Sequence, residues 1–352
     1  MIQPNEYVRS LLKRSPGETV TARGWVKTRR DSKNVHFIQL NDGSSPADLQ
    51  VVLDAGVVSP EVVATITTGA CLSVEGELAA SPGKGQAVEL RAKSVTVHGA
   101  ADPEKYPLQK KKHTLETLRE IGHLRSRSNT FGAVWRVRNA LAVAIHKFFQ
   151  DRGFIYVHTP VISSSDAEGA GSMFTVSTLE PGKPADFTQD FFGRHTYLTV
   201  SGQLEAEIFA LAFANVYTFG PTFRAENSNT PRHLAEFYMI EPEMAFCDLK
   251  DNADLAEAFL KFQVEQILAN CGPDLQFLQK WYEPELIRTL EGLVSSSFER
   301  ILSTLGSRPI KSSILPAPRS TIGLGEASAS CAQARSPLLP FMPPTTSAQR
   351  AA

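Results

Sequence analysis

The sequence predicts an α+β protein that has a small N-terminal β-barrel followed by an antiparallel sheet flanked by helices. Between residues 18 and 100, five short apolar runs alternate with turn residues, which is typical of a small closed barrel. From Val134 onward, apolar residues recur at helical spacing. Farther along, two runs rich in β-branched and aromatic residues flank the turn-forming segment 227–231, and this pattern predicts a long hairpin.

The front domain is expected to span residues 1–102. Its strands are predicted at the five apolar runs, Thr19–Val26, Val35–Leu40, Leu49–Leu53, Cys71–Leu78 and Ala87–Val97. Residues 103–130 are interpreted as a hinge because they contain prolines and many cations. The cations, which include Lys110–Lys112, Arg125 and Arg127, form either a solvated face or a surface against an RNA backbone, and the sequence leaves both open.

The second half begins with an amphipathic helix. Val137, Leu141, Ile145 and Phe148 make an apolar stripe, and the helix is expected to end at Asp151. A strand is expected to follow it within the segment 153–160.

The predicted hairpin joins Val216–Arg224 to Phe237–Phe246. Arg224 and Glu226 are two residues apart, so their side chains are expected on one face. A planar guanidinium suits an α-phosphate, and Phe237 offers a ring on which a base can stack. The alternative for such a short string is an exposed ion pair beside a core phenylalanine.

Composition narrows the class of protein. The chain has 352 residues, 42% of them hydrophobic, and a formal net charge of −1, so any RNA-binding surface must be local. Its best apolar run, 208–219, is too short to cross a bilayer. Four scattered cysteines without a CxxC pair disfavour a disulfide framework or structural zinc, and a reducing cytoplasm fits them.

The string from Phe223 to Glu243 resembles motif 2 of the class II aminoacyl-tRNA synthetases, and the asparaginyl family in particular. The resemblance implies that Arg224 holds the α-phosphate of ATP and that Glu226 lies near ATP or the tRNA 3′ end, and it makes these two the catalytic residues. It also implies that Arg232 and His233 reach the γ-phosphate and that Phe237 stacks on adenine. ATP and Mg²⁺ are the cofactors implied.

Two further segments resemble the same family. Gly153–Pro160 is similar to motif 1, through which class II enzymes form homodimers. The front domain resembles the oligonucleotide-binding (OB) fold that aspartyl and asparaginyl enzymes use on the anticodon. The residues that the resemblance assigns to tRNA binding are Arg29, Arg30, Phe37 and Gln50, with Phe37 stacking on the central anticodon base and Gln50 hydrogen-bonding it.

The resemblance also implies an amino-acid site made of Glu168, Gln203 and Ala206. Glu168 is expected to pair with the substrate ammonium group, and Gln203 helps hold the substrate. Aspartyl enzymes carry a lysine at the position of Ala206, and burying a substrate carboxylate without that cation costs several kcal/mol, so its absence favours asparagine. The alternative is that Ala206 only packs within a helix.

The resemblance ends near residue 300. The carboxylates that hold Mg²⁺ in the family, and motif 3, have no counterpart here, so no metal ligand is identified. Residues 131–301 are therefore expected to be a partial catalytic domain with an incomplete sheet. Residues 302–352, rich in Pro, Ser and Ala, are expected to be a disordered tail, read out of frame from about Ile301.

The expected function is that of an asparagine-tRNA ligase, impaired by the loss of motif 3. Its expected partners are tRNA(Asn), asparagine and a second copy of the chain, with no membrane and no DNA. A catalytically inactive tRNA-binding module and a nondiscriminating aspartyl enzyme are the alternatives.

Overall fold

The computed structural model describes most of the chain up to residue 300. The described residues are 3, 6–83, 85–109, 113–167, 172–182, 185–227, 230 and 233–300. They form two compact units, one made of residues up to Ile145 together with those from Phe259 on, and the other made of His146–Ala258. The expected tail, the basic run 110–112, Glu168 and Arg232 lie outside the described residues.

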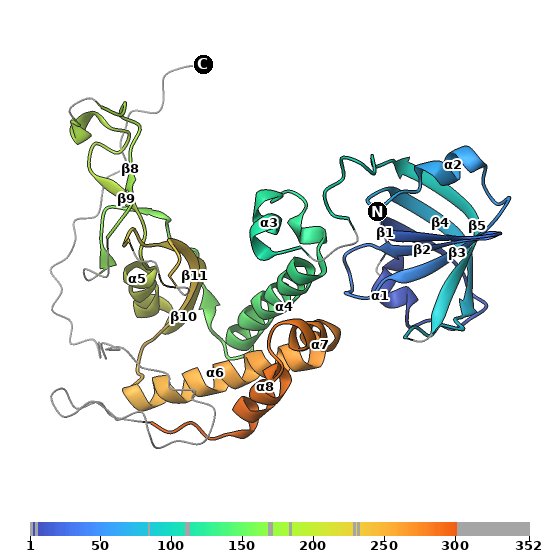
Figure 1. The fold of residues 1–352 in the computed structure, drawn as a ribbon. Coiled ribbons are helices and arrows are strands. Elements are labelled where there is room, and N and C mark those ends of the chain that lie inside the picture. The colour runs from blue at the N-terminus through green and yellow to red at the C-terminus, as the bar shows by residue number, and fades with distance from the viewer. Residues whose placement is uncertain are drawn as a thin grey trace, which may run out of the picture. The chain divides into compact units, whose positions relative to one another are not determined.

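The first unit contains the predicted barrel, and the prediction of its five strands is confirmed (Figure 1). The strands are β1 (Thr19–Ser32), β2 (Val35–Asn41), β3 (Leu49–Asp54), β4 (Cys71–Ala80) and β5 (Val88–Gly99), closed in the order β1-β2-β3-β5-β4. Side chains alternate between the core and the outside, as a period of two requires. Ile38, Leu40, Val51 and Leu90 are fully buried inside the barrel.

Barrel closure depends on Gly76, where β4 passes close to β5. A Cβ at this position would lie 2.0 Å from the carbonyl oxygen of Arg91. We expect Gly76→Ala to lower the free energy of unfolding by about 1–3 kcal/mol, because the backbone of β5 must move. Gly99→Ala is the matched control, since a Cβ there meets nothing within 4 Å. Urea denaturation should separate the two variants, and equal stabilities would contradict the close approach.

Helices make up the rest of the first unit. They include the short helices α1 (Val8–Leu11), α2 (Pro60–Thr65), α3 (Leu115–Glu120) and η2 (Arg125–Arg127), and α7 (Gly272–Trp281) and α8 (Leu286–Ser295). The long helices α4 (Asn129–Gln150) and α6 (Leu249–Asn270) are divided between the two units. The predicted apolar stripe on α4 faces the core, since Val137 and Leu141 pack against Ile267 and Leu275. This packing explains why residues up to Ile145 and those from Phe259 on belong to one compact unit, and the expected boundaries at residues 102 and 130 stay predictions.

The second unit contains the predicted hairpin, formed by β10 (Asn215–Phe223) and β11 (Glu236–Met244). They pair antiparallel, and β6 (Ile155–Tyr156) pairs parallel with β10. A small second sheet has the order β7-β9-β8, made of Ile162–Ser163, Thr196–Leu198 and Thr175–Val176. Along the chain, η4 (Phe187–Gln189) lies between β8 and β9, and α5 (Gln203–Phe213) lies between β9 and β10.

Tyr217 is the largest fully buried side chain of the second unit. Its ring stacks on Phe149, with centroids 4.5 Å apart, and its hydroxyl is 2.8 Å from Nδ1 of His146. Burial raises the pKa of this hydroxyl.

Within the part of the chain described, no helix combines the length and the apolar character needed to cross a membrane.

Candidate functional site

Arg224 and Phe237 lie together at the open end of the β10–β11 hairpin. Arg224 directly follows β10, and its amide donates to the carbonyl of Ala235 at 3.0 Å. Because Phe237 pairs with Thr222 in the register of the hairpin, its ring faces the same region, and Cζ of Arg224 is 5.7 Å from the ring centroid. The two groups therefore lie side by side, and their common contact with a nucleotide stays a prediction.

The guanidinium of Arg224 has hydrogen-bonding capacity to spare. Its Nε is buried and finds no hydrogen-bond partner among the described residues. An unpaired donor at a cationic group is costly unless an anion satisfies it. The position beside an aromatic ring fits the phosphate and base of a nucleotide.

Glu226 and His233 lie in the segment that joins the two strands, between Arg224 and Phe237, and both are exposed. Glu226 has a partner, since its Oε1 accepts a hydrogen bond from the amide of Ser172 at 3.3 Å. His233 Nδ1 is 3.1 Å from the hydroxyl of Thr230. Arg232, predicted for the γ-phosphate, lies outside the described residues.

The predicted amino-acid residues fall in different environments. Gln203 begins α5, and its side chain donates to Glu207 Oε1 at 3.0 Å. Ala206 is fully buried, in a cluster with Val157 and Val216. Its side chain therefore makes core contacts, as the packing alternative states, and its part in the amino-acid site stays a prediction. Glu168 lies outside the described residues.

Glu241 is a residue that the sequence reasoning missed. It lies on β11 opposite Thr218, whose hydroxyl donates to Oε2 at 2.9 Å. Oε2 also accepts from the amide of Gly202 at 3.1 Å, and Oε1 accepts from the hydroxyl of Ser201. Glu241 thus holds the turn that starts α5 and positions Gln203. Its spacing four residues after Phe237 on one strand is the signal that could have revealed it.

The turn at Gly202 needs glycine. A Cβ there would lie 2.7 Å from the hydroxyl of Thr159 and 3.3 Å from Glu241 Oε2. Only glycine allows this close approach, so Gly202 sets the distance between the start of α5 and β11.

ATP and Mg²⁺ are the cofactors that the sequence resemblance implies. Arg224 and Phe237 fit the phosphate and the base of the nucleotide. Within the described ranges, no group of three His, Cys, Asp or Glu side chains could hold a metal ion.

The outer face of β2 and β3 in the first unit holds two of the predicted anticodon residues. Phe37 is half-buried and pairs across the sheet with Arg30, whose Cζ is 5.0 Å from the ring centroid. Gln50 lies on the same outer face, because β3 alternates it with the buried Leu49 and Val51.

Gln50 is fixed by two neighbours that the sequence reasoning missed. It pairs across the sheet with Gln39, whose Nε2 donates to Gln50 Oε1 at 3.3 Å, and its own Nε2 donates to Glu89 Oε2 at 2.9 Å. Glu89 is only 4% exposed. The amide orientation of Gln50 is thereby set before any ligand arrives.

Arg29 has an internal role in the structure. Its guanidinium donates to the carbonyls of Val63 and Ile66, at the end of α2, and to Asp31. These bonds attach α2 to the barrel. Arg30, by contrast, lies over the ring of Phe37, and the role of both arginines in RNA binding stays a prediction.

Comparison with known proteins gives the same two domains. Residues 114–307, more than half of the chain, match the family described as tRNA synthetases class II (D, K and N). Residues 20–97 match the OB-fold nucleic acid binding domain.

The curated relatives include the asparagine–tRNA ligase of Solibacter usitatus, which is 83% identical over 306 residues, covering 86% of this chain and 66% of the relative. That of Microcystis aeruginosa is 58% identical over 287 residues, covering 81% of this chain and 63% of the relative. The chain therefore spans about two thirds of the length of these relatives.

Solved structures share the fold. The asparaginyl-tRNA synthetase from Pyrococcus horikoshii complexed with asparaginyl-adenylate has a TM-score of 0.70 at 24% identity, covering 82% of this chain and 63% of that one. The Entamoeba histolytica asparaginyl-tRNA synthetase in complex with asparaginyl-adenylate has a TM-score of 0.65 at 23% identity, covering 76% of this chain and 59% of that one. A second structure of that enzyme has a TM-score of 0.65 at 22% identity, covering 76% of this chain and 60% of that one. With the closed barrel, the motif-2 hairpin and these matches, the chain belongs to the class II tRNA synthetases of the D, K and N group, as a member of the asparaginyl-tRNA synthetases.

Proposed function

We propose that this chain supplies the ATP-binding and anticodon-binding parts of an asparagine-tRNA ligase. The observation that carries the proposal is the buried Nε of Arg224, which finds no partner among the described residues and lies beside the ring of Phe237. In the proposed reaction, a carboxylate oxygen of asparagine attacks the α-phosphorus of ATP. The bond from that phosphorus to the bridging oxygen breaks, and pyrophosphate leaves.

The chain's own groups act on charge and position. Arg224 stabilises the negative charge that grows on the α-phosphate oxygens, and Phe237 orients the adenine. Glu241 holds the turn from which Gln203 reaches the amino acid. In the second step, a hydroxyl of the terminal ribose of tRNA(Asn) attacks the carbonyl carbon of the adenylate, and AMP leaves.

The anticodon part of the proposal rests on the outer face of β2 and β3. Phe37 offers a stacking surface beside the cation of Arg30, and Gln50 presents a fixed amide edge to a base. We further propose a cytoplasmic location and pairing of two copies through the segment 153–160, where Ile155 and Tyr156 are exposed.

Isotope exchange between ATP and pyrophosphate tests the proposal. We expect exchange that depends on asparagine and is weak in comparison with a full-length relative, because the chain spans about two thirds of the relatives' length. Exchange that depends on aspartate would instead support a nondiscriminating aspartyl enzyme. Absence of ATP binding would contradict the ligase proposal.

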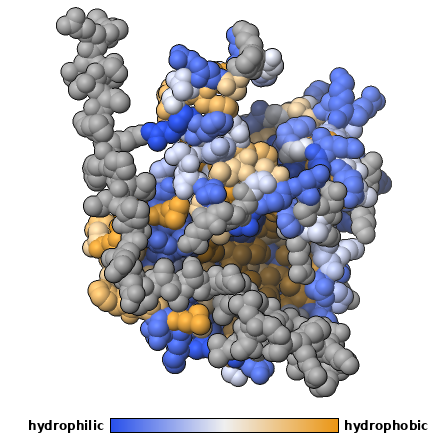
Figure 2. Space-filling model, turned by 90° about the vertical axis from the view of Figure 1, so that its left-hand side faces the viewer, coloured by the Kyte–Doolittle hydropathy of each residue, from blue (hydrophilic) through white to orange (hydrophobic). Residues whose placement is uncertain are grey.

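A second candidate function is a tRNA-binding module without catalysis. The barrel closes on itself, whereas α5 in the second unit exposes large apolar side chains: Ile208, Phe209, Leu211 and Phe213. Figure 2 shows one face of the molecule on which apolar residues, drawn in orange, reach the surface. Retained tRNA affinity without exchange would favour this candidate.

A further inference from the structure

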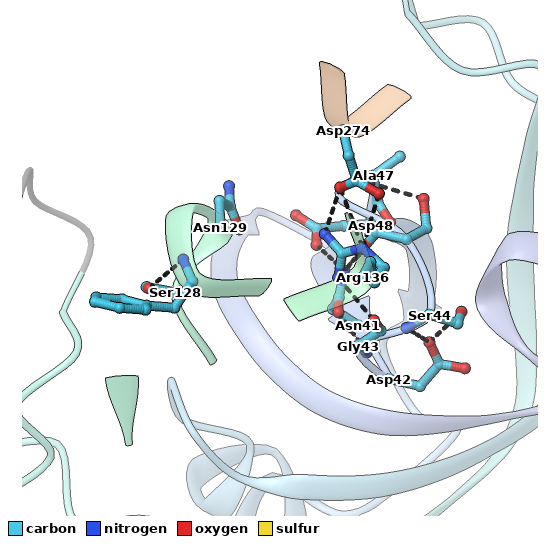
Figure 3. A network of polar contacts seen from close by, with 12 residues as sticks. Asn41, Asp42, Gly43, Ser44, Ala47, Asp48, Ser128, Asn129, Arg136 and Asp274 are labelled. Carbon is cyan, nitrogen blue, oxygen red and sulfur yellow. Dashed lines mark hydrogen bonds and ion pairs between the residues drawn. The ribbon is translucent and has the colours of Figure 1, made fainter. Parts of the chain in front are cut away.

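Residues 41–48, which are the last residue of β2 and the loop to β3, are held in one shape by Asn41. This side chain is 6% exposed and donates to the carbonyls of Ser45 and Ala47, at 3.1 and 3.2 Å, and to Asp48 Oδ1 at 2.8 Å (Figure 3). Its own oxygen accepts from the amide of Gly43 at 2.7 Å. Because one amide meets four partners, the loop is preorganised.

Arg136 of α4 joins this loop to α7. Its Nη1 donates to the carbonyl of Gly43 at 2.7 Å. Its Nε and Nη2 donate to the carboxylate of Asp274, at 3.1 and 2.8 Å. Asp274 is 5% exposed and lies in the first turn of α7, where the helix dipole favours a negative charge. One guanidinium thus connects three segments that are far apart in the sequence.

The surroundings of Arg136 match this role. Gly132, one turn earlier on α4, leaves room for the guanidinium, since a Cβ there would lie 3.2 Å from Nη1. A second cation lies close by, because Lys27 of β1 donates to the carbonyl of Arg127 and to Asn129 Oδ1. Lys27 and Asp48 are both half-buried, and desolvation lowers the pKa of Lys27 and raises the pKa of the Asp48 carboxyl.

The loop is also continuous with the anticodon face. It follows Phe37 and Gln39 on β2 and ends immediately before Leu49 and Gln50 on β3. A ligand that orders these two strands therefore acts on residues 41–48 directly. A buried ion pair has few alternative geometries, because separating its charges leaves each one uncompensated.

We propose that residues 41–48, Arg136 and Asp274 form a joint that transmits occupancy of the barrel's outer face to α4 and α7, with Arg136 as its positioning residue. The choice of RNA as the ligand rests on the proposed function, whereas the contacts of the joint can be tested without RNA. If the Arg136–Asp274 salt bridge only added stability, breaking it would speed amide hydrogen exchange throughout the unit. It would not change which segments RNA binding protects from exchange.

Hydrogen–deuterium exchange of the full chain tests the joint. In Arg136→Gln without ligand, we expect the amides of residues 41–48 and 272–281 to exchange about tenfold faster than in the wild type. Arg138→Gln is the matched control, because Arg138 is exposed on the same helix and contacts only the ring of Trp135 in the described contacts, at 5.5 Å. It should leave both segments unchanged. Equal exchange in Arg136→Gln and the wild type would overturn the proposal.

An RNA stem-loop that carries the anticodon loop of tRNA(Asn) provides the second readout. In the wild type it should slow exchange in β2, β3 and residues 272–281, and in Arg136→Gln only in β2 and β3. Protection of 272–281 in both proteins would overturn transmission through Arg136. If the RNA does not bind the wild type, the anticodon proposal fails and the ligand-free comparison still decides the joint. Asp274→Asn, which nearly keeps the side-chain volume, replaces Arg136→Gln if that variant unfolds.

Discussion

Arg224→Ala is expected to lower asparagine-dependent pyrophosphate exchange by about 10²–10³-fold, the loss typical of removing one donor to a charge that develops in the transition state. The variant should also weaken ATP binding, since the guanidinium is the cation beside the stacking ring of Phe237. Calorimetric titration with ATP measures the affinity, and the exchange assay measures the rate. Arg224→Lys should recover little, because a lysine cannot present the planar pair of donors.

Arg194→Ala is the matched control, because Arg194 is an exposed arginine of the same unit. It should leave ATP affinity and exchange unchanged. A wild-type affinity for ATP in Arg224→Ala would show that the nucleotide binds elsewhere. Circular dichroism must first show that the variant is folded. We expect it to be folded, since the backbone amide of Arg224 pairs with Ala235 independently of its side chain.

Phe37→Ala is expected to lower the affinity for the anticodon stem-loop by about 1–3 kcal/mol, or roughly 5- to 150-fold, because base–aromatic stacking has this magnitude. The loss should persist at high salt, since stacking, unlike phosphate pairing, releases no counterions. Fluorescence anisotropy at two salt concentrations measures it. ATP affinity should stay unchanged.

Thr96→Ala serves as the control, because Thr96 is exposed on β5 of the same barrel. Equal losses of RNA affinity and ATP affinity in Phe37→Ala would indicate misfolding instead of a lost contact. Gln50→Ala should weaken RNA binding too, but it is a less clean test. Removing Gln50 takes a donor from the buried Glu89, so part of its effect will be on stability.

The sequence was most informative where structure depends on local periodicity. The five barrel strands and the β10–β11 hairpin lie where alternating apolar residues and turn formers place them. The neighbourhood of Arg224 and Phe237 was also predictable, because hairpin register follows from the two strands themselves.

The sequence was least informative about where long or small side chains end up. Arg29 reaches carbonyls 34 and 37 residues away, at Val63 and Ile66, and no local pattern contains those partners. Ala206 lies in a core cluster with Val157 and Val216, which depends on how α5 docks. The contact of Arg136 with Asp274 spans 138 residues and becomes visible only in three dimensions.

The hairpin also has a consequence for the behaviour of the chain in concentrated solution. Among the described strands, β11 pairs with β10 on one side only, so its other margin can recruit an extended segment of another molecule. Pro242 lies within β11 and has no amide hydrogen to offer. It interrupts the row of donors that such a foreign segment would need, and so protects the hairpin against fibril-like growth.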